Sequence, residues 1–229
     1  MDSVEKARKV KEMGVDILVL DPLLVNKDFE ALSKIRNEIG EDVELIVNNN
    51  CLINCPLLNY HQSFLSLLGK SEDIVSDFCY LKCSMSRLID VVNYLKSDVI
   101  RPEDLHYYEE LGYRRFKVID RCTPPSIMLK RVKAYCERKY DGNLLDIVQH
   151  YCYRDTVSPE CYKENIYINN NALDGFLDFF VSKKCNGRNC MAECNHCYDF
   201  AKKAISVNLD FSSEALKNKR STMEKVLTN

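Results

Sequence analysis

The sequence predicts an α/β fold, namely a partial or incomplete TIM-like (β/α) barrel with parallel strands, followed by a cysteine-rich helical C-terminal region. Strand-like apolar runs alternate with amphipathic helical segments at intervals of about thirty residues, which is typical of right-handed βα units. A complete (β/α)₈ barrel takes about 250 residues, yet only four or five strands are visible here. We therefore expect a partial barrel or an open sheet over residues 1–143, with a helical extension over 144–229.

The first half of the chain alternates between the two apolar periodicities. Asp2 can cap a first helix that Gly14 ends, and Gly40 ends a second helix. Residues 70–83 are polar and are predicted to be irregular. The predicted helices are 2–14, 29–39, 61–68 and 87–96, and the predicted strands are 15–20 and 43–48.

The second half continues the alternation and then loses its strands. Pro102 and the Pro124-Pro125 pair each suit the first turn of a helix. The predicted strands are 98–100, 116–119 and 165–168, and the predicted helices are 102–112, 124–140, 172–183 and 196–207. The last twenty residues are polar, and we expect them to be frayed or helical at the surface.

Composition limits the partners of the chain. Lys and Arg number 32 against 34 Asp and Glu, so the net charge of −2 provides no overall basic field for nucleic acid or an anionic membrane. RNA binding would need a local basic patch. No apolar run is long enough to span a bilayer, and no export signal is visible, so we expect a cytoplasmic protein without a membrane segment.

The cysteines are the strongest chemical signal in the sequence. Two pairs have the same x₃ spacing, and four more cysteines lie within thirteen residues near the C-terminus. Thiolates select zinc or iron–sulfur over hard cations. The predicted metal ligands are Cys51, Cys55, Cys79 and Cys83 in the first set, and Cys185, Cys190, Cys194 and Cys197 in the second. We expect one or two 4Fe-4S clusters, with zinc as the alternative, because the spacings do not decide between them.

The other cysteines, Cys122, Cys136, Cys152 and Cys161, lack close partners in the sequence and are interpreted as core or surface thiols. A disulfide scaffold is disfavoured, because the chain is larger than such scaffolds and has strong βα alternation.

Polar residues follow each predicted strand, where parallel α/β folds place their sites. Arg101 and Arg121 could together bind a carboxylate or phosphate, although ordinary helix-capping ion pairs explain them equally well. His61 could act as a proton donor or could simply be hydrogen-bonded, and His196 could replace a cysteine ligand. The sequence contains no HExxH, GxSxG, GxGxxG or P-loop motif.

Several blocks together carry a family resemblance: NNNCLINCPLLNYH, DFCYLKCS, IRPEDLHYYEELGYRRFKVIDR, KAYCERKYDGNLLDI, NNNALDGFLDFF and CNGRNCMAECNHCY. Over nearly the whole chain, the sequence resembles the collagenase-like peptidase family U-thirty-two. The resemblance implies a TIM-barrel-like domain with a cysteine-bound iron–sulfur cluster. Some members take part in oxygen-independent hydroxylation of ubiquinone precursors or RNA bases, some of them as paired paralogues, and others bear only the peptidase name.

By position, Cys51 and Cys55 match the CxxxCP loop of the family, Cys79 and Cys83 match the pair that follows, and residues 185–197 match its C-terminal set. Relatives have further strands before the position of Asp2, and they space their cysteines differently. Which four cysteines would share one cluster is therefore left open.

Three functional hypotheses follow. The first is an iron–sulfur enzyme for redox chemistry or oxygen-independent hydroxylation of a small anionic molecule or RNA. The second is a metal-stabilised module that depends on a homo- or hetero-oligomeric partner to complete the barrel. The third, a peptidase, rests on the family name alone.

Overall fold

A three-stranded parallel sheet forms the framework in the computed structural model, which describes residues 2–68, 78–119, 123–149, 166–182, 184–185, 194–207 and 221. The strands are β1 (Leu18–Val19), β2 (Val43–Ile46) and β3 (Arg115–Lys117), in the order β1-β2-β3. Both strand pairs are parallel. The mixed α/β class with parallel strands is thus confirmed, and these three strands form an open sheet in the described ranges.

The connection from β1 to β2 packs helices against the sheet. Helix α1 (Val4–Glu12) precedes β1 and packs on α3 (Phe29–Ile39), and the short α2 (Pro22–Val25) lies between β1 and α3. Asp28 caps α3 by accepting a hydrogen bond from the Ala31 N–H, and Gly40 ends it at φ +84°. The predicted helix over 29–39 therefore has the right bounds, whereas α2 was not predicted.

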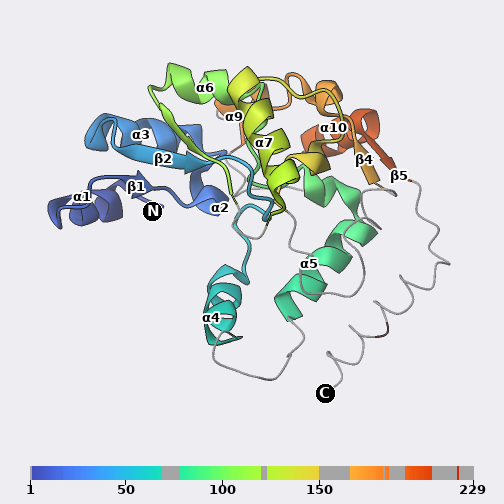
Figure 1. The fold of residues 1–229 in the computed structure, drawn as a ribbon, viewed down its shortest axis with the longest axis horizontal. Helices are drawn as coiled ribbons and strands as arrows, with labels where there is room; N and C mark the ends of the chain where they lie inside the picture. Colours follow the sequence, from blue (N-terminus) through green and yellow to red (C-terminus); the bar gives the residue numbers. More distant parts are fainter. Residues whose placement is uncertain are drawn as a thin grey trace.

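The connection from β2 to β3 is longer and contains α4 (Leu58–Leu68), α5 (Phe78–Ile89), the 3₁₀ turn η1 (Val91–Tyr94) and α6 (Leu105–Glu110). Helices α4 and α5 project from the body of the fold (Figure 1). The irregular segment predicted over 70–83 is wrong at 78–83, where α5 is helical. The helix predicted over 87–96 is also wrong, because Asp90 accepts a hydrogen bond from the Val92 N–H and starts a separate turn there.

Residues 98–100 were predicted to be a strand, but they form none. Their backbone makes single contacts instead, with the Ile100 N–H donating to the Val47 carbonyl at 2.9 Å. The segment thus lies beside the end of β2 without extending the sheet.

After β3 the chain forms α7 (Pro125–Glu137), η2 (Leu144–Asp146), β4 (Ile166–Ile168), η3 (Asn170–Leu173), α9 (Asp178–Val181), α10 (His196–Ala204) and β5 (Ile205–Val207). Strands β4 and β5 pair antiparallel. The single helix predicted over 172–183 is divided by a turn in which Gly175 has φ +78°. The helix predicted over 196–207 ends early, because β-branched Ile205 and Val207 extend along β4.

One hydrophobic cluster joins residues on both sides of the predicted division at 143/144, including Leu45, Tyr108, Leu144, Ile166 and Phe180. The two-part domain division stays a prediction. None of the helices in the described ranges is long and apolar enough to cross a membrane.

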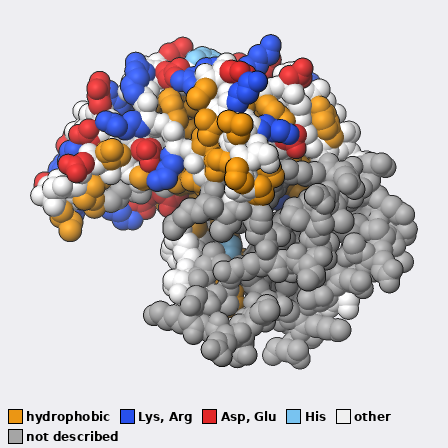
Figure 2. Space-filling view, viewed as in Figure 1, with side chains coloured by type: hydrophobic (Ala, Val, Ile, Leu, Met, Phe, Trp, Pro, Cys, Tyr) orange, Lys and Arg blue, Asp and Glu red, His pale blue; other side chains and the backbone are white. Residues whose placement is uncertain are grey.

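Helix α7 carries an apolar outer face. Leu129 is 69% exposed, and Val132 and Cys136 are exposed beside it, on the side opposite the buried Ala134 and Tyr135. Figure 2 shows this group of hydrophobic side chains between basic ones. Of the two alternatives given for Cys136, a core or a surface thiol, the structure shows the surface thiol.

Candidate functional site

Buried amides connect the carboxyl ends of the strands. The Asn48 side chain donates to the Ile119 carbonyl at 2.5 Å and accepts from the Ile119 N–H at 2.8 Å, so it joins the ends of β2 and β3. The Asn26 amide donates to the carbonyls of Ile46 and Asp98, each at 2.8 Å. These bonds fix the backbone that leads into the first cysteine loop.

The loop from Cys51 to Cys55 is held at several points. The Cys51 N–H donates to the Asp98 carboxyl at 2.9 Å, and the Asp98 N–H donates back to the Cys51 carbonyl at 2.9 Å. Further along, the Ile53 N–H donates to the Lys96 carbonyl and the Asn54 N–H to the Leu23 carbonyl, both at 3.1 Å. The loop backbone is therefore organised by the 96–98 segment and by α2.

Asp98 is a fully buried carboxyl at this loop, with 0% exposure. It also accepts a hydrogen bond from the Asn49 amide at 2.5 Å. Burial raises the pKa of Asp98 to about 6, against the lowering effect of the Asn49 and Cys51 donors and of the more distant Lys27 charge. Asp98 was not predicted as a site residue, since a lone aspartate carries no spacing signal.

Helix α5 presents Cys79, Cys83 and Arg87 at successive i, i+4 positions, so they share one face. Arg87 is 5% exposed. Its Nη1 donates to the Cys83 Sγ at 3.0 Å, and its Nη2 donates to the Asn50 carbonyl at 2.6 Å. One guanidinium thus links the second predicted cysteine pair to the start of the loop that carries the first.

Two of the C-terminal cysteines, Cys197 and Cys185, lie near a second buried cation, Lys27, which is 4% exposed. Its Nζ donates to the Leu95 carbonyl at 3.1 Å and lies 4.9 Å from the centre of the Phe176 ring. Burial lowers the pKa of Lys27 to about 8, while the nearby Cys197, Asp98, Asp104 and Cys185 side chains act in the opposite direction. Lys27 therefore brings a positive charge close to both thiols.

An anionic, thiolate-bound group would need converging sulfur ligands and a nearby positive charge. Among the described side chains, no three Cys, His, Asp or Glu residues converge as metal ligands, and Cys190 lies outside the described ranges. Within the same ranges, neither Arg87 nor Lys27 forms an ion pair with a carboxylate, and the Arg87 Nε is buried without a hydrogen-bond acceptor. A buried cation needs a counter-charge. Arg87 has the Cys83 sulfur beside it, whereas Lys27 is influenced by the Asp98 and Asp104 carboxyls as well as by the thiols. The buried Arg87 guanidinium thus has the charge and the donors that an anionic group would need, but the described cysteines do not gather around one metal position.

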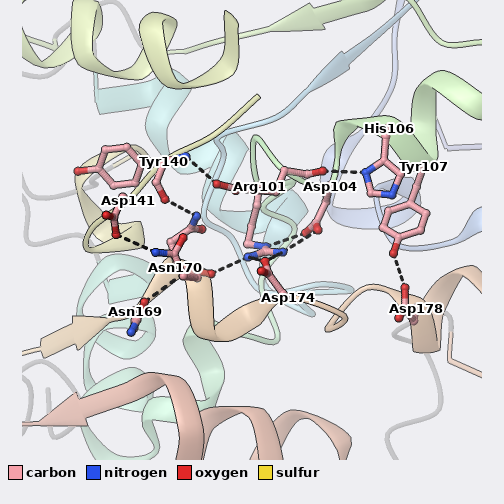
Figure 3. A network of polar contacts seen from close by, with 12 residues as sticks. Arg101, Asp104, His106, Tyr107, Tyr140, Asp141, Asn169, Asn170, Asp174 and Asp178 are labelled. Atoms are coloured by element: carbon pink, nitrogen blue, oxygen red, sulfur yellow. Dashed lines mark hydrogen bonds and ion pairs between the residues drawn. The ribbon is translucent and has the colours of Figure 1, made fainter. Parts of the chain in front are cut away.

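Arg101, predicted to bind a substrate anion, lies in a network of polar contacts that Figure 3 shows. Its Nε and Nη2 donate to the two carboxyl oxygens of Asp104 at 2.9 and 2.8 Å. Its Nη1 donates to the Asn170 carbonyl at 2.6 Å and to the Asp174 carboxyl at 3.2 Å. Arg101 and Asp104 are buried, whereas the Asp174 side chain is 73% exposed. The guanidinium thus joins the start of α6 to η3.

The remaining predicted residues are only partly placed. Arg121 and Cys190 lie outside the described residues. His61 is half-buried on α4, and Cys194 is half-buried just before α10. His196 has its Nε2 at 2.8 Å from the Phe176 carbonyl, and its ring stacks on Phe179. The catalytic and ligand roles of these residues stay predictions.

Arg87 and Lys27 were also missed by the sequence analysis. The spacing of Cys79, Cys83 and Arg87 was a usable signal, but it was lost when 70–83 was interpreted as irregular. Lys27 had no such signal, because its aromatic neighbours Phe176 and Phe180 are distant in sequence.

A cavity of about 560 Å³ lies beside Cys55. Asp2 and Lys6 of α1, Asp21 at the end of β1, and Asn54 form part of its wall. Asp2 and Lys6 form an ion pair at 2.6 Å, and the hydrogen bond from Lys6 is the main cause of the lowered pKa of Asp2. The volume is within the usual range for a small-molecule site.

Fold and site together define an α/β protein with cysteines at the carboxyl edge of a parallel sheet. The chain is similar to an uncharacterized protease from Methanocaldococcus jannaschii, with 31% identity over 208 residues. The similar region covers 90% of this chain and 58% of that relative, so the chain spans little more than half of the relative's length. No protein-family profile and no solved structure match the chain. The similarity supports a relationship to a protease-named protein, and membership of the U-thirty-two family stays a prediction.

Proposed function

We propose that the chain is an iron–sulfur protein that modifies a small anionic molecule or RNA by redox chemistry or oxygen-independent hydroxylation. The contact of the buried Arg87 guanidinium with the Cys83 sulfur supports this proposal, because a cation placed there favours a thiolate. Cys51, Cys55, Cys79 and Cys83 would hold the first cluster, and Cys185, Cys190, Cys194 and Cys197 a second. A bound cluster would supply electron transfer at the carboxyl edge of the sheet.

The protein's own side chains would bind and orient the substrate. In this proposal the cavity beside Cys55 receives the substrate, His61 donates a proton and Arg121 binds the anionic group. Arg101 takes part only if a substrate carboxylate or phosphate replaces the exposed Asp174 on its guanidinium, since its other donors bind Asp104 and Asn170.

The test is iron, acid-labile sulfide and zinc analysis of anaerobically purified protein, together with its visible spectrum. Wild type is compared with a Cys51→Ala, Cys55→Ala variant and a Cys194→Ala, Cys197→Ala variant. Cys136→Ala is the control, because that thiol is exposed on α7. We expect each double variant to lose part of the iron and sulfide and the control to lose none. Wild type without iron and sulfide would overturn the proposal.

A zinc-stabilised, partner-dependent module is the second candidate, and one observation favours it. The described sheet has three strands with β1 and β3 at its ends, and the chain covers 58% of its relative. A partner that supplies further strands would complete a TIM-like barrel. Zinc without sulfide, together with a stable oligomer by light scattering, would support this candidate over the first.

Peptidase activity is the third candidate, and it is favoured only by the printed name of the relative. It predicts cleavage of denatured collagen that persists after chelation of metals.

Reduced, metal-bound thiols also favour a reducing compartment, so we propose a cytoplasmic location.

A further inference from the structure

Arg87 has an unusual set of partners for a buried arginine. Its Nη1 binds a cysteine sulfur, its Nη2 binds the Asn50 carbonyl, and its Nε has no acceptor among the described residues. The Tyr94 ring lies 5.4 Å from the guanidinium carbon. Arg101, which is buried to nearly the same extent, pairs with the Asp104 carboxylate, whereas Arg87 has a cysteine sulfur in that place among the described residues.

The two residues bonded to Arg87 lie on the two segments that carry the first cysteine set, namely α5 and the loop after β2. Cys83 is on α5, one helical turn after Cys79, whereas Asn50 directly precedes Cys51 in the loop after β2. Because α5 projects from the body of the fold, the guanidinium is a direct polar link between the two segments (Figure 1). Its planar fork suits this task, since two donors can point in fixed directions at once.

We propose that Arg87 is the positioning residue of the first thiolate set, and this inference rests on the proposed function. It holds the α5 cysteines against the Cys51 loop and carries the positive charge that offsets the negative charge of the bound group. Its buried Nε is the donor left for a sulfur of that group. Cys79 and Cys83 then depend on Arg87 for their alignment with Cys51 and Cys55.

The experiment uses three substitutions in a Cys194→Ala, Cys197→Ala background, which weakens the second set. Arg87→Met removes both charge and donors, Arg87→Gln keeps a donor without charge, and Arg87→Lys keeps the charge without the fork. Arg138→Met is the matched control, because Arg138 is a partly exposed arginine that pairs with Glu109. Each protein is purified anaerobically, and metal and sulfide contents, metal loss to a chelator and the reduction potential are measured.

We expect Arg87→Met to lose its metal about ten- to a hundredfold faster than the parent, as is usual when a group that orients a metal ligand is removed. Arg87→Lys should be intermediate, because one ammonium cannot bind the Cys83 sulfur and the Asn50 carbonyl together. In Arg87→Gln the reduction potential should fall, since a lost positive charge disfavours the more negative reduced state. If Arg87 were merely structural, the Gln and Lys variants would not differ from each other in metal loss and reduction potential in this way.

The results separate this inference from the proposed function. A parent protein without iron, sulfide or zinc overturns both. A parent that holds metal, with Arg87→Gln and Arg87→Lys equal to it in metal loss and potential, overturns the inference alone. If Arg87→Met fails to fold, as judged by circular dichroism of the metal-free protein, the Gln and Lys variants decide.

Discussion

The replacement Arg101→Met tests whether the Arg101–Asp104 pair is a structural element of the fold. Both side chains are buried, and two parallel hydrogen bonds at 2.9 and 2.8 Å join them. Removal of the arginine leaves the Asp104 carboxylate buried without its main partner, which typically costs about 3–5 kcal/mol of folding free energy. The Asp174 contact adds little, because that carboxylate is exposed and such pairs contribute about 0–1 kcal/mol.

The assay is urea unfolding followed by circular dichroism. With a slope of about 3 kcal/mol/M, the expected loss moves the midpoint down by roughly 1–1.7 M. Asp174→Asn should leave the midpoint nearly unchanged. The double variant Arg101→Met, Asp104→Leu should recover much of the loss, because no buried charge is left unpaired. A loss below about 1 kcal/mol for Arg101→Met would refute the reasoning and would favour the substrate-binding role predicted for this residue.

Three further predictions concern single sites. Burial raises the pKa of Asp98 from 3.8 to about 6, so ionisation of Asp98 should destabilise the fold as pH rises from 4 to 7. Over that range the free energy of unfolding of wild type, measured relative to Asp98→Asn, should fall by on the order of 2–3 kcal/mol, and a pH-independent difference would contradict this. Asn48→Ala should cost about 1–3 kcal/mol in urea unfolding, because the Ile119 N–H loses its acceptor while Arg131 still donates to the Ile119 carbonyl. Gly112→Ala should lower the melting temperature more than Gly14→Ala does. Both glycines have positive φ, but only at Gly112 would the new Cβ lie 2.9 Å from the Arg36 side chain.

The parallel βα framework could be predicted from the sequence because its signals are local. The apolar run at 43–46 and the helix over 29–39, with its Asp28 cap and Gly40 end, each carry their own pattern. One error fell where non-local contacts decide. Residues 98–100 have strand-like composition, but Asp98 binds the Cys51 loop, so the segment joins no ladder.

The candidate site was predictable only in part, for the same reason. Cysteine spacing pointed to Cys51, Cys55, Cys79 and Cys83 without any knowledge of the fold. The cations beside the cysteines depend on tertiary packing, as the contact of Lys27 with the Leu95 carbonyl illustrates. Spacing can therefore nominate ligands for a soft metal and a cation on the same helix face, such as Arg87, whereas a cation such as Lys27 emerges only from the structure.

The segment 95–98 gives the two cysteine sets a common support. On one side, the Lys96 carbonyl and Asp98 bind the backbone of the Cys51 loop. On the other, the Leu95 carbonyl accepts from Lys27, whose charge is close to Cys185 and Cys197. The Lys96 ammonium also lies 4.8 Å from the ring of Tyr198, the residue after Cys197 on α10. Because one short stretch of backbone contacts both regions, a displacement of the loop at one set would be transmitted through 95–98 to the other. The 95–98 segment is therefore the described stretch through which we expect the two predicted cysteine sets to influence each other.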